Sequence, residues 1–249
     1  MMLIKVGLQE WPQRAFPLSA LPQLQAHRGY CQTGEKENTI GAFQVAAEYG
    51  YRMVELDVHL SRDGVPVVFH DFNLSKAVIG SGRMHLRDNR LVSEVTSDEL
   101  GEMGVPNLHD VLTKSRVEYF NIELKTKLLS HWRFEEIVVD LVINCGFAQR
   151  VLFSSFSPRT MHRLFQLTED IPIAFLCEKW MPQYRHIIPY HCVHLSEAKL
   201  DIQTLQRLNA ECVPVSVWTV NSVPRARDLL REGTRSIISD TITPRLLGS

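Results

Sequence analysis

Short apolar segments rich in β-branched residues alternate with amphipathic segments along almost the whole chain. This alternation is typical of repeated βα units around a parallel sheet. Nine segments have the character of strands, ending near Arg28, Asp57, Phe69, Glu123, Ser155, Phe175, Leu195, Trp218 and Ser239. An α/β fold of the TIM (β/α)8 type needs eight of them, so one strand is surplus.

A hairpin accounts for the surplus strand. Residues 53–60 and 65–70 are separated only by Ser61-Arg62-Asp63-Gly64, and Asp-Gly is a hairpin signal rather than a crossover. We therefore expect one barrel strand to continue past the rim and fold back as a hairpin arm at the C-terminal face.

The register of this arm bears on the chemistry. If Arg62 and Asp63 are the two central turn residues, Glu55 lies opposite His70 across the hairpin. A three-residue turn with a bulge would shift the pairing by one residue.

Helix signals fit between the strands. Asn38 or Thr39 caps a helix over residues 40–48, with Gly50 as its terminator, and further helices start near residues 97, 107 and 158. Between about 73 and 96 the pattern has no clean period, which indicates a small inserted loop region over the active face. No linker or repeat interrupts the pattern, so we predict a single domain over residues 1–249.

Composition narrows the function classes. A net charge of -1 and a pI near 6.8 argue against nucleic-acid binding, which requires a basic face. The N-terminal apolar stretch is too short and too charged for a signal peptide or a membrane span, so we expect a cytoplasmic protein with no integral membrane segment. The five cysteines are scattered and odd in number, which favours reduced thiols over disulfides or a zinc ribbon.

Carboxylates gather at two predicted strand ends. Because alternate residues of a strand share a face, Glu55 projects with Asp57, and Glu123 with Lys125. Apolar neighbours occupy the opposite face, at Val54, Leu56 and Val58, so we expect the acids to point into the barrel. Converging carboxylates require a cation, and oxygen ligands favour Mg²⁺ or Ca²⁺ over zinc.

Two histidines complete the candidate chemistry. His27 ends the first barrel strand and precedes Arg28, whose guanidinium suits phosphate oxygens, while His70 arrives with the hairpin arm. Two imidazoles on opposite sides of a phosphodiester can divide the proton transfers. The sequence leaves either one free to be the acid or the base.

Five ordered motifs between about Gln25 and Asp240 resemble the glycerophosphodiester phosphodiesterase family. They are Ala26-His27-Arg28-Gly29 with Glu37-Asn38-Thr39, Val54 to Asp71, Asn121 to Lys125, Val217 to Asn221, and Ser239-Asp240. The chain departs from the family pattern at Lys36, where Pro is usual, at Ser61, where Thr is usual, and after Asn73, where an Arg-Thr-Thr stretch is common.

The resemblance implies metal-dependent hydrolysis of a small-molecule glycerophosphodiester to sn-glycerol 3-phosphate and an alcohol. It assigns catalysis to His27 and His70. It further implies one divalent cation, Mg²⁺ or Ca²⁺ with Mn²⁺ as another candidate, on Glu55, Asp57 and Glu123. Substrate or phosphate contacts would come from Arg28, Lys125, Glu37 and Trp218.

Two rival functions stay open. A lysophospholipase D-type enzyme would keep the chemistry and act on lysophospholipids, whereas a catalytically silent barrel would serve as a binding or regulatory module. Among other clusters, His191 and His194 fall on opposite faces of a strand, which argues against a metal pair. Trp180 and Met181 could form an apolar rim or simply pack. His59 could support the site indirectly or contact the substrate, rather than bind a metal.

Overall fold

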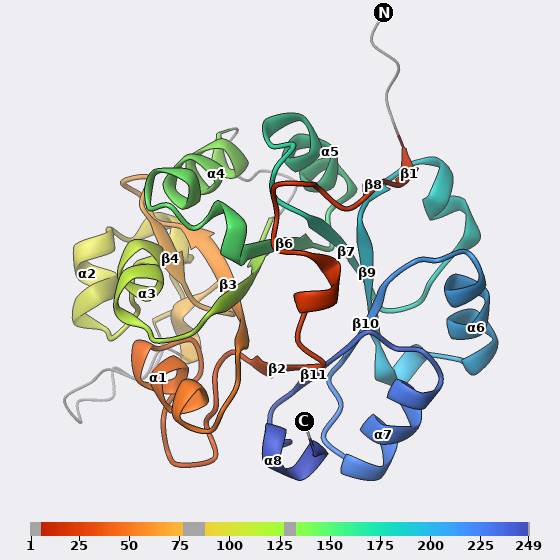
Figure 1. Cartoon of the computed structure of the whole chain (residues 1–249). Helices are drawn as coiled ribbons and strands as arrows, with labels where there is room; N and C mark the ends of the chain where they lie inside the picture. Colours follow the sequence, from red (N-terminus) through yellow and green to blue (C-terminus); the bar gives the residue numbers. More distant parts are fainter. Residues whose placement is uncertain (1–5, 77–87, 127–132, 249) are drawn as a thin grey trace, which may run out of the picture.

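Eight parallel strands close into a barrel in the computed structural model, which describes residues 6–76, 88–126 and 133–248 (Figure 1). Pairing of β2 with β3 completes the ring, so the predicted TIM-barrel fold is confirmed. In order around the ring the strands are β2 (Leu24–His27), β3 (Met53–Leu60), β5 (Tyr119–Leu124), β6 (Val151–Ser155), β7 (Ile173–Cys177), β9 (Cys192–Ser196), β10 (Val215–Trp218) and β11 (Ser236–Ser239).

Helices form the outer layer of the barrel (Figure 1). They are α1 (Ile40–Glu48), α2 (Ser97–Glu102), α3 (Leu108–Lys114), α4 (Phe134–Asn144), α5 (Pro158–Leu167), α6 (Ile202–Ala210), α7 (Val223–Arg231) and α8 (Pro244–Leu247). Predicted caps hold α1: the Thr39 hydroxyl accepts from the Ala42 amide, and Gly50 follows the helix at φ +88°. None of the described helices is long and apolar enough to cross a bilayer.

The hairpin arm exists, but its predicted register is wrong by one residue. β4 (Pro66–Val68) runs antiparallel to β3, and Val58 lies opposite Val68. The register that pairs Glu55 with His70 would have put Asp57 there, so Glu55 is not opposite His70. Ser61 and Val65 close a three-residue turn, whose last residue, Gly64, has φ +81°. Gly64, with its left-handed backbone, is the additional turn residue that shifts the register. The Phe69 amide therefore donates to the Asp57 carbonyl oxygen.

The predicted inserted region lies partly outside the described residues, which omit 77–87. Its described ends are held together by a bridge between Asn73 and Leu91 and carry short 3-10 turns at Leu74–Lys76 and Val92–Glu94. Leu74 and Val92 are buried in a small apolar cluster with Val67 of the arm. The ends of the insertion therefore form a packed extension of the hairpin.

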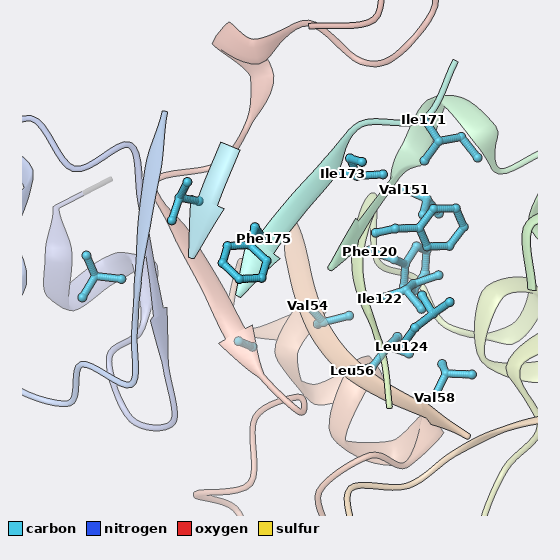
Figure 2. Packing of buried hydrophobic residues seen from close by; sticks show 14 of the residues in the cluster. Val54, Leu56, Val58, Phe120, Ile122, Leu124, Val151, Ile171, Ile173 and Phe175 are labelled. Atoms are coloured by element: carbon cyan, nitrogen blue, oxygen red, sulfur yellow. The ribbon is translucent and has the colours of Figure 1, made fainter. Parts of the chain in front are cut away.

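Alternation along each strand separates the helical layer from the barrel interior. Val54, Leu56, Phe120 and Ile122 face outward and pack under the helices (Figure 2). At the N-terminal end of the barrel a second cluster closes the interior, with Phe16, Leu21, Met53, Leu152, Ala174 and Cys192. Above it the interior is polar: Asn121 connects Ser154 to Gln25, which bonds Ser236. This hydrogen-bonded layer is the floor of the site.

One crossover was not predicted from the sequence. The chain passes from β7 to β9 through a 3-10 segment, η5 (Pro182–His186), and β8 (Pro189–Tyr190), which pairs with β1 (Gly7–Leu8). Trp180 and Tyr190 are buried in contact with each other, with ring centroids 5.7 Å apart. Trp180 therefore packs into the core, which supports the packing interpretation for this residue, whereas Met181 is exposed.

Candidate active site

A cavity of about 170 Å³ opens at the C-terminal ends of the barrel strands. Seven of the nine predicted site residues line it: His27, Arg28, Glu55, His70, Glu123, Lys125 and Trp218. Of the other two, Asp57 is 1% exposed and contacts both basic residues of the cavity, whereas Glu37 lies outside it as the partner of Arg28. The fold thus brings these residues together from four barrel strands, β2, β3, β5 and β10, and from the hairpin arm.

Three buried carboxylates form one cluster. Glu55, Asp57 and Glu123 each offer an oxygen within 4.8 Å of the others, the arrangement of residues that can hold a metal ion. Lys125 touches the same cluster, with its ammonium 3.3 Å from Asp57 and 3.0 Å from Glu123. An all-oxygen donor set of this kind fits a hard divalent cation better than zinc.

The pKa values of the three carboxylates in the cluster are shifted in different directions. Burial raises the pKa of Glu55 well above its usual range, and the neighbouring carboxylates add to the shift. Burial and Asp57 together raise the pKa of Glu123 to about 7. Burial would also raise the pKa of Asp57, but Lys125 and Arg28 outweigh it and hold that pKa below its ordinary value. Bringing the cluster to full ionisation therefore requires additional positive charge.

Arg28 is fixed by a strained turn directly after β2. It adopts φ 56° and Gly29 follows at φ 89°, where a Cβ would lie 2.7 Å from the Ala42 side chain of α1. The Arg28 guanidinium donates to Glu37 at 3.1 Å and lies 3.4 Å from Asp57. Glycine at position 29 thus allows α1 to approach and the guanidinium to bridge two carboxylates.

Asn38 was predicted as a possible helix cap, and the structure also places its side chain in the site, in contact with Asp57. Its side-chain Nδ2 donates to the Asp57 carboxylate at 2.9 Å, and its side-chain Oδ1 accepts from the Asp57 backbone amide. Asn38 itself has φ 58°, a conformation that asparagine tolerates well. Its position before the Thr39 cap was visible in the sequence, but the contact with Asp57 required the fold.

His27 is anchored from the far end of the chain. Its Nδ1 lies 2.6 Å from Asp240, leaving Nε2 3.9 Å from Glu55. Asn221 donates to the other oxygen of Asp240 at 2.8 Å. Burial would raise the pKa of Asp240, but its bonds to His27 and Asn221 hold that pKa below its ordinary value. A carboxylate on Nδ1 sets the ring orientation and tautomer, so Nε2 is the nitrogen that faces the chemistry.

His70 is anchored in the same way by its neighbour in sequence. Its Nδ1 lies 2.7 Å from Asp71, and His59 Nε2 lies 3.2 Å from the His70 carbonyl oxygen. Burial lowers the pKa of His70 and lowers that of His59 to about 4. His59 is therefore a neutral donor that supports the backbone of His70, which agrees with the indirect role considered for it.

An apolar wall faces the charged side of the cavity. Trp218 packs edge-on against Phe156, with centroids 5.6 Å apart, and Leu176 and Ile238 complete this wall. Phe156 was not predicted as a site residue, although it directly follows the β6 strand end, where barrel enzymes carry their functional side chains. The cavity consequently offers a carbon skeleton an apolar surface beside the charged groups.

The discounted histidine pair stays apart from this site. The Ile173 amide donates to His191 Nδ1 at 3.0 Å, while His194 is fully buried on β9 with neither ring nitrogen bonded to a described residue. Burial lowers the pKa of both rings, to about 4 for His191 and about 3 for His194. The hydrogen bond of His191 is to the backbone of the neighbouring strand β7, which gives this histidine a structural role.

The chain is similar to known proteins over most of its length. The family model for the glycerophosphoryl diester phosphodiesterase family matches residues 27–243. A Bacillus altitudinis glycerophosphodiester phosphodiesterase is 29% identical over 236 residues, covering 86% of this chain and 93% of that protein. A probable glycerophosphodiester phosphodiesterase 2 of Mycobacterium tuberculosis is 36% identical over 143 residues, a match that spans 57% of this chain and about half (51%) of that protein.

Solved structures share the barrel. A putative glycerophosphoryl diester phosphodiesterase from Silicibacter pomeroyi superposes with a TM-score of 0.78 at 21% identity, covering 94% of this chain and 95% of that one. An Oleispira antarctica phosphodiesterase in complex with the product sn-glycerol-3-phosphate gives a TM-score of 0.74 at 25% identity, covering 92% of this chain and 96% of that one.

Proposed function

Because the chain belongs to the glycerophosphoryl diester phosphodiesterase family, we propose that it hydrolyses glycerophosphodiesters to sn-glycerol 3-phosphate and an alcohol with the help of a divalent cation. One observation carries the proposal: two imidazoles, each anchored on a carboxylate, share one cavity with a buried carboxylate cluster. The product complex of the Oleispira relative supports the substrate class. Strands from both ends of the sequence pair in the ring, β2 with β11, which supports one catalytic domain over residues 1–249.

The three carboxylates of the cluster would hold the cation, Mg²⁺ or Ca²⁺ by their donor chemistry, or Mn²⁺. A cation held there would polarise a phosphate oxygen and offset the charge of the cluster. Arg28 and Lys125 neutralise the remaining phosphate charge, which grows at the non-bridging oxygens as the nucleophile approaches. Both are held in place by carboxylates, so little reorganisation is required when substrate binds.

His27 and His70 divide the proton transfers. With Nδ1 of each ring held by Asp240 or Asp71, Nε2 is the nitrogen available to the substrate. One ring removes a proton from the attacking oxygen, and the other protonates the departing alkoxide. Glu37 positions Arg28 from outside the cavity, and Trp218 faces the carbon skeleton of the substrate.

The test is release of sn-glycerol 3-phosphate from a panel of glycerophosphodiesters, run in parallel with EDTA, Mg²⁺, Ca²⁺ and Mn²⁺. We expect turnover that EDTA abolishes and one of the ions restores. Turnover that is confined to lysophospholipids would replace the substrate class, and a folded protein that binds an ion without turning over any phosphodiester would identify a silent module. Undiminished turnover in EDTA would refute metal dependence.

A further inference from the structure

A buried carboxylate outside the catalytic cavity has no part in the chemistry described above. Glu135 lies in the first turn of α4 and is 5% exposed, yet it does not line the cavity. Removing a carboxylate from water is unfavourable unless hydrogen bonds replace the lost hydration. The Thr160 hydroxyl of α5 supplies such a bond, at 3.0 Å from Glu135 Oε1. Thr160 is itself 1% exposed, so this hydrogen bond is enclosed in the protein.

The proton of the Thr160 hydroxyl fixes the direction of a longer chain of hydrogen bonds. A hydroxyl group carries one proton, and Thr160 donates it to the Glu135 carboxylate. The Thr126 hydroxyl lies 3.0 Å from the same Thr160 oxygen, so Thr126 must be the donor in that contact. The chain therefore runs from Thr126 to Thr160 to Glu135. A carboxylate at the accepting end strengthens both bonds, because each hydrogen bond polarises the next.

This chain begins beside Lys125, the lysine assigned to the phosphate. Lys125 directly follows β5, and hydrogen bonds hold the residues on both sides of it. On one side, the Ser155 hydroxyl of β6 donates to the Leu124 carbonyl oxygen at 3.0 Å. On the other side, Thr126 is held by Thr160. The two residues that flank the lysine are therefore attached to β6 and to α5.

A fixed backbone matters for a lysine, because its ammonium is carried on a long flexible stem. The Lys125 ammonium lies 3.0 Å from Glu123 and 3.3 Å from Asp57. These carboxylates draw it toward the cluster, so its place relative to the phosphate depends on where the Lys125 backbone lies. A displacement of about 1 Å at such a group can slow a reaction roughly 10²-fold.

We propose that Glu135 is a positioning residue for Lys125. Through the two threonine hydroxyls it fixes the backbone from which the phosphate-binding ammonium extends, and it does so without lining the cavity. This inference rests on the proposed phosphodiesterase function and adds to it a residue outside the cavity.

The experiment measures kcat and KM for release of sn-glycerol 3-phosphate, with the glycerophosphodiester and the ion that give the highest turnover, and the melting temperature of each variant. Glu135→Met removes the acceptor at similar volume, and Thr126→Val removes the donor. Each should lower kcat about tenfold and change KM by no more than about twofold, because the lysine counts most where the charge on the phosphate is greatest.

Two further variants control for other effects. Glu135→Gln retains an accepting oxygen, so it should keep kcat within about twofold of wild type. Glu136→Gln is the matched control on the same helix, because Glu136 is ion-paired with Arg133 and has no part in the chain. It should leave kcat unchanged.

Combined variants test whether the effect passes through one chain to the lysine. Thr126→Val with Glu135→Met should be no slower than either variant alone, because both interrupt the same chain. In Lys125→Met, which lacks the ammonium, adding Thr126→Val should lower kcat by no more than about twofold.

A further tenfold loss in either combined variant would overturn the positioning role, because the residues would then act independently. A lowered melting temperature with wild-type kcat would also overturn it, since the chain would then only stabilise the fold. So would a Glu135→Gln protein as slow as Glu135→Met. Failure of the proposed function looks different: the wild type itself would release no sn-glycerol 3-phosphate with any of the ions.

Discussion

Replacing Glu123 with glutamine should change how stability depends on pH in the metal-free protein. The folded-state pKa of Glu123 is about 7, raised by burial and by Asp57 from an ordinary value of 4.5. Between these values the folded protein holds a proton that the unfolded chain releases, so stability falls as pH rises through this window. The difference between these two pKa values corresponds to about 3 kcal/mol of stability lost once the pH exceeds 7.

The wild-type profile alone would conceal this effect. Burial lowers the pKa of His59 and His191 to about 4, below the ordinary 6.5, so these groups add stability as pH rises between those values. The difference between wild type and Glu123→Gln removes their contribution, because both proteins carry the same histidines. In EDTA, the variant should gain about 2.5 kcal/mol relative to wild type between pH 5 and pH 8.

Urea unfolding followed by circular dichroism at pH 5, 6, 7 and 8 measures this difference. Glu118→Gln is the matched control, because its hydrogen bond to Arg52 holds the pKa of Glu118 below 4.5 and any effect falls at lower pH. Parallel profiles for wild type and Glu123→Gln would refute the reasoning. Adding Mg²⁺ at 100 times its Kd at pH 8 should stabilise the wild type by about 2.7 kcal/mol at that pH. The same Mg²⁺ concentration should stabilise it less at pH 5, because protons compete for the same oxygens and raise the Kd.

Four further substitutions test the site and the hairpin. His27→Ala or His70→Ala should lower kcat by roughly 10²-fold or more with unchanged folding, and near-normal turnover of either would remove it from the chemistry. Asp240→Asn should lower kcat about 10- to 100-fold with little change in KM, since it weakens a charged hydrogen bond to His27, and an equal rise in KM would contradict this positioning role. Gly64→Ala should cost about 1 kcal/mol in a thermal or urea melt, because φ is +81° there while nothing lies within 4 Å of an added Cβ; an unchanged midpoint would show that the turn adjusts.

Periodicity located the strands because each barrel strand has a different environment on its two faces. Val54 and Leu56 face the helical layer while Glu55 and Asp57 face the interior, so the alternation that identified the strand also identified the acids. The same argument placed Glu123 on the interior face of β5, in register with Asp57. The local pattern of apolar and polar residues is therefore sufficient to predict a site residue wherever one strand carries core residues on one face and site residues on the other.

Register was harder to predict, because turn length does not follow from composition alone. Asp63-Gly64 fits a two-residue turn as well as a three-residue one that ends on a left-handed glycine. The additional hydrogen bonds favour the longer turn: the Ser61 hydroxyl accepts from the Val65 amide, and Asp63 binds the amide and hydroxyl of Ser97 at the start of α2. Those contacts depend on where α2 lies, which the hairpin sequence does not contain.

Each catalytic histidine candidate is held by an aspartate, and the distance in sequence between the two residues determines whether the contact could be predicted. Asp71 is adjacent to His70 and was visible in the sequence as part of a motif, whereas Asp240 is 213 residues from His27 and meets it only when β11 pairs with β2. Closure of the barrel therefore fixes His27, while the hairpin arm fixes His70 independently of that closure. It follows that damage to the β2–β11 seam should release His27 first and leave His70, its aspartate and the arm in place.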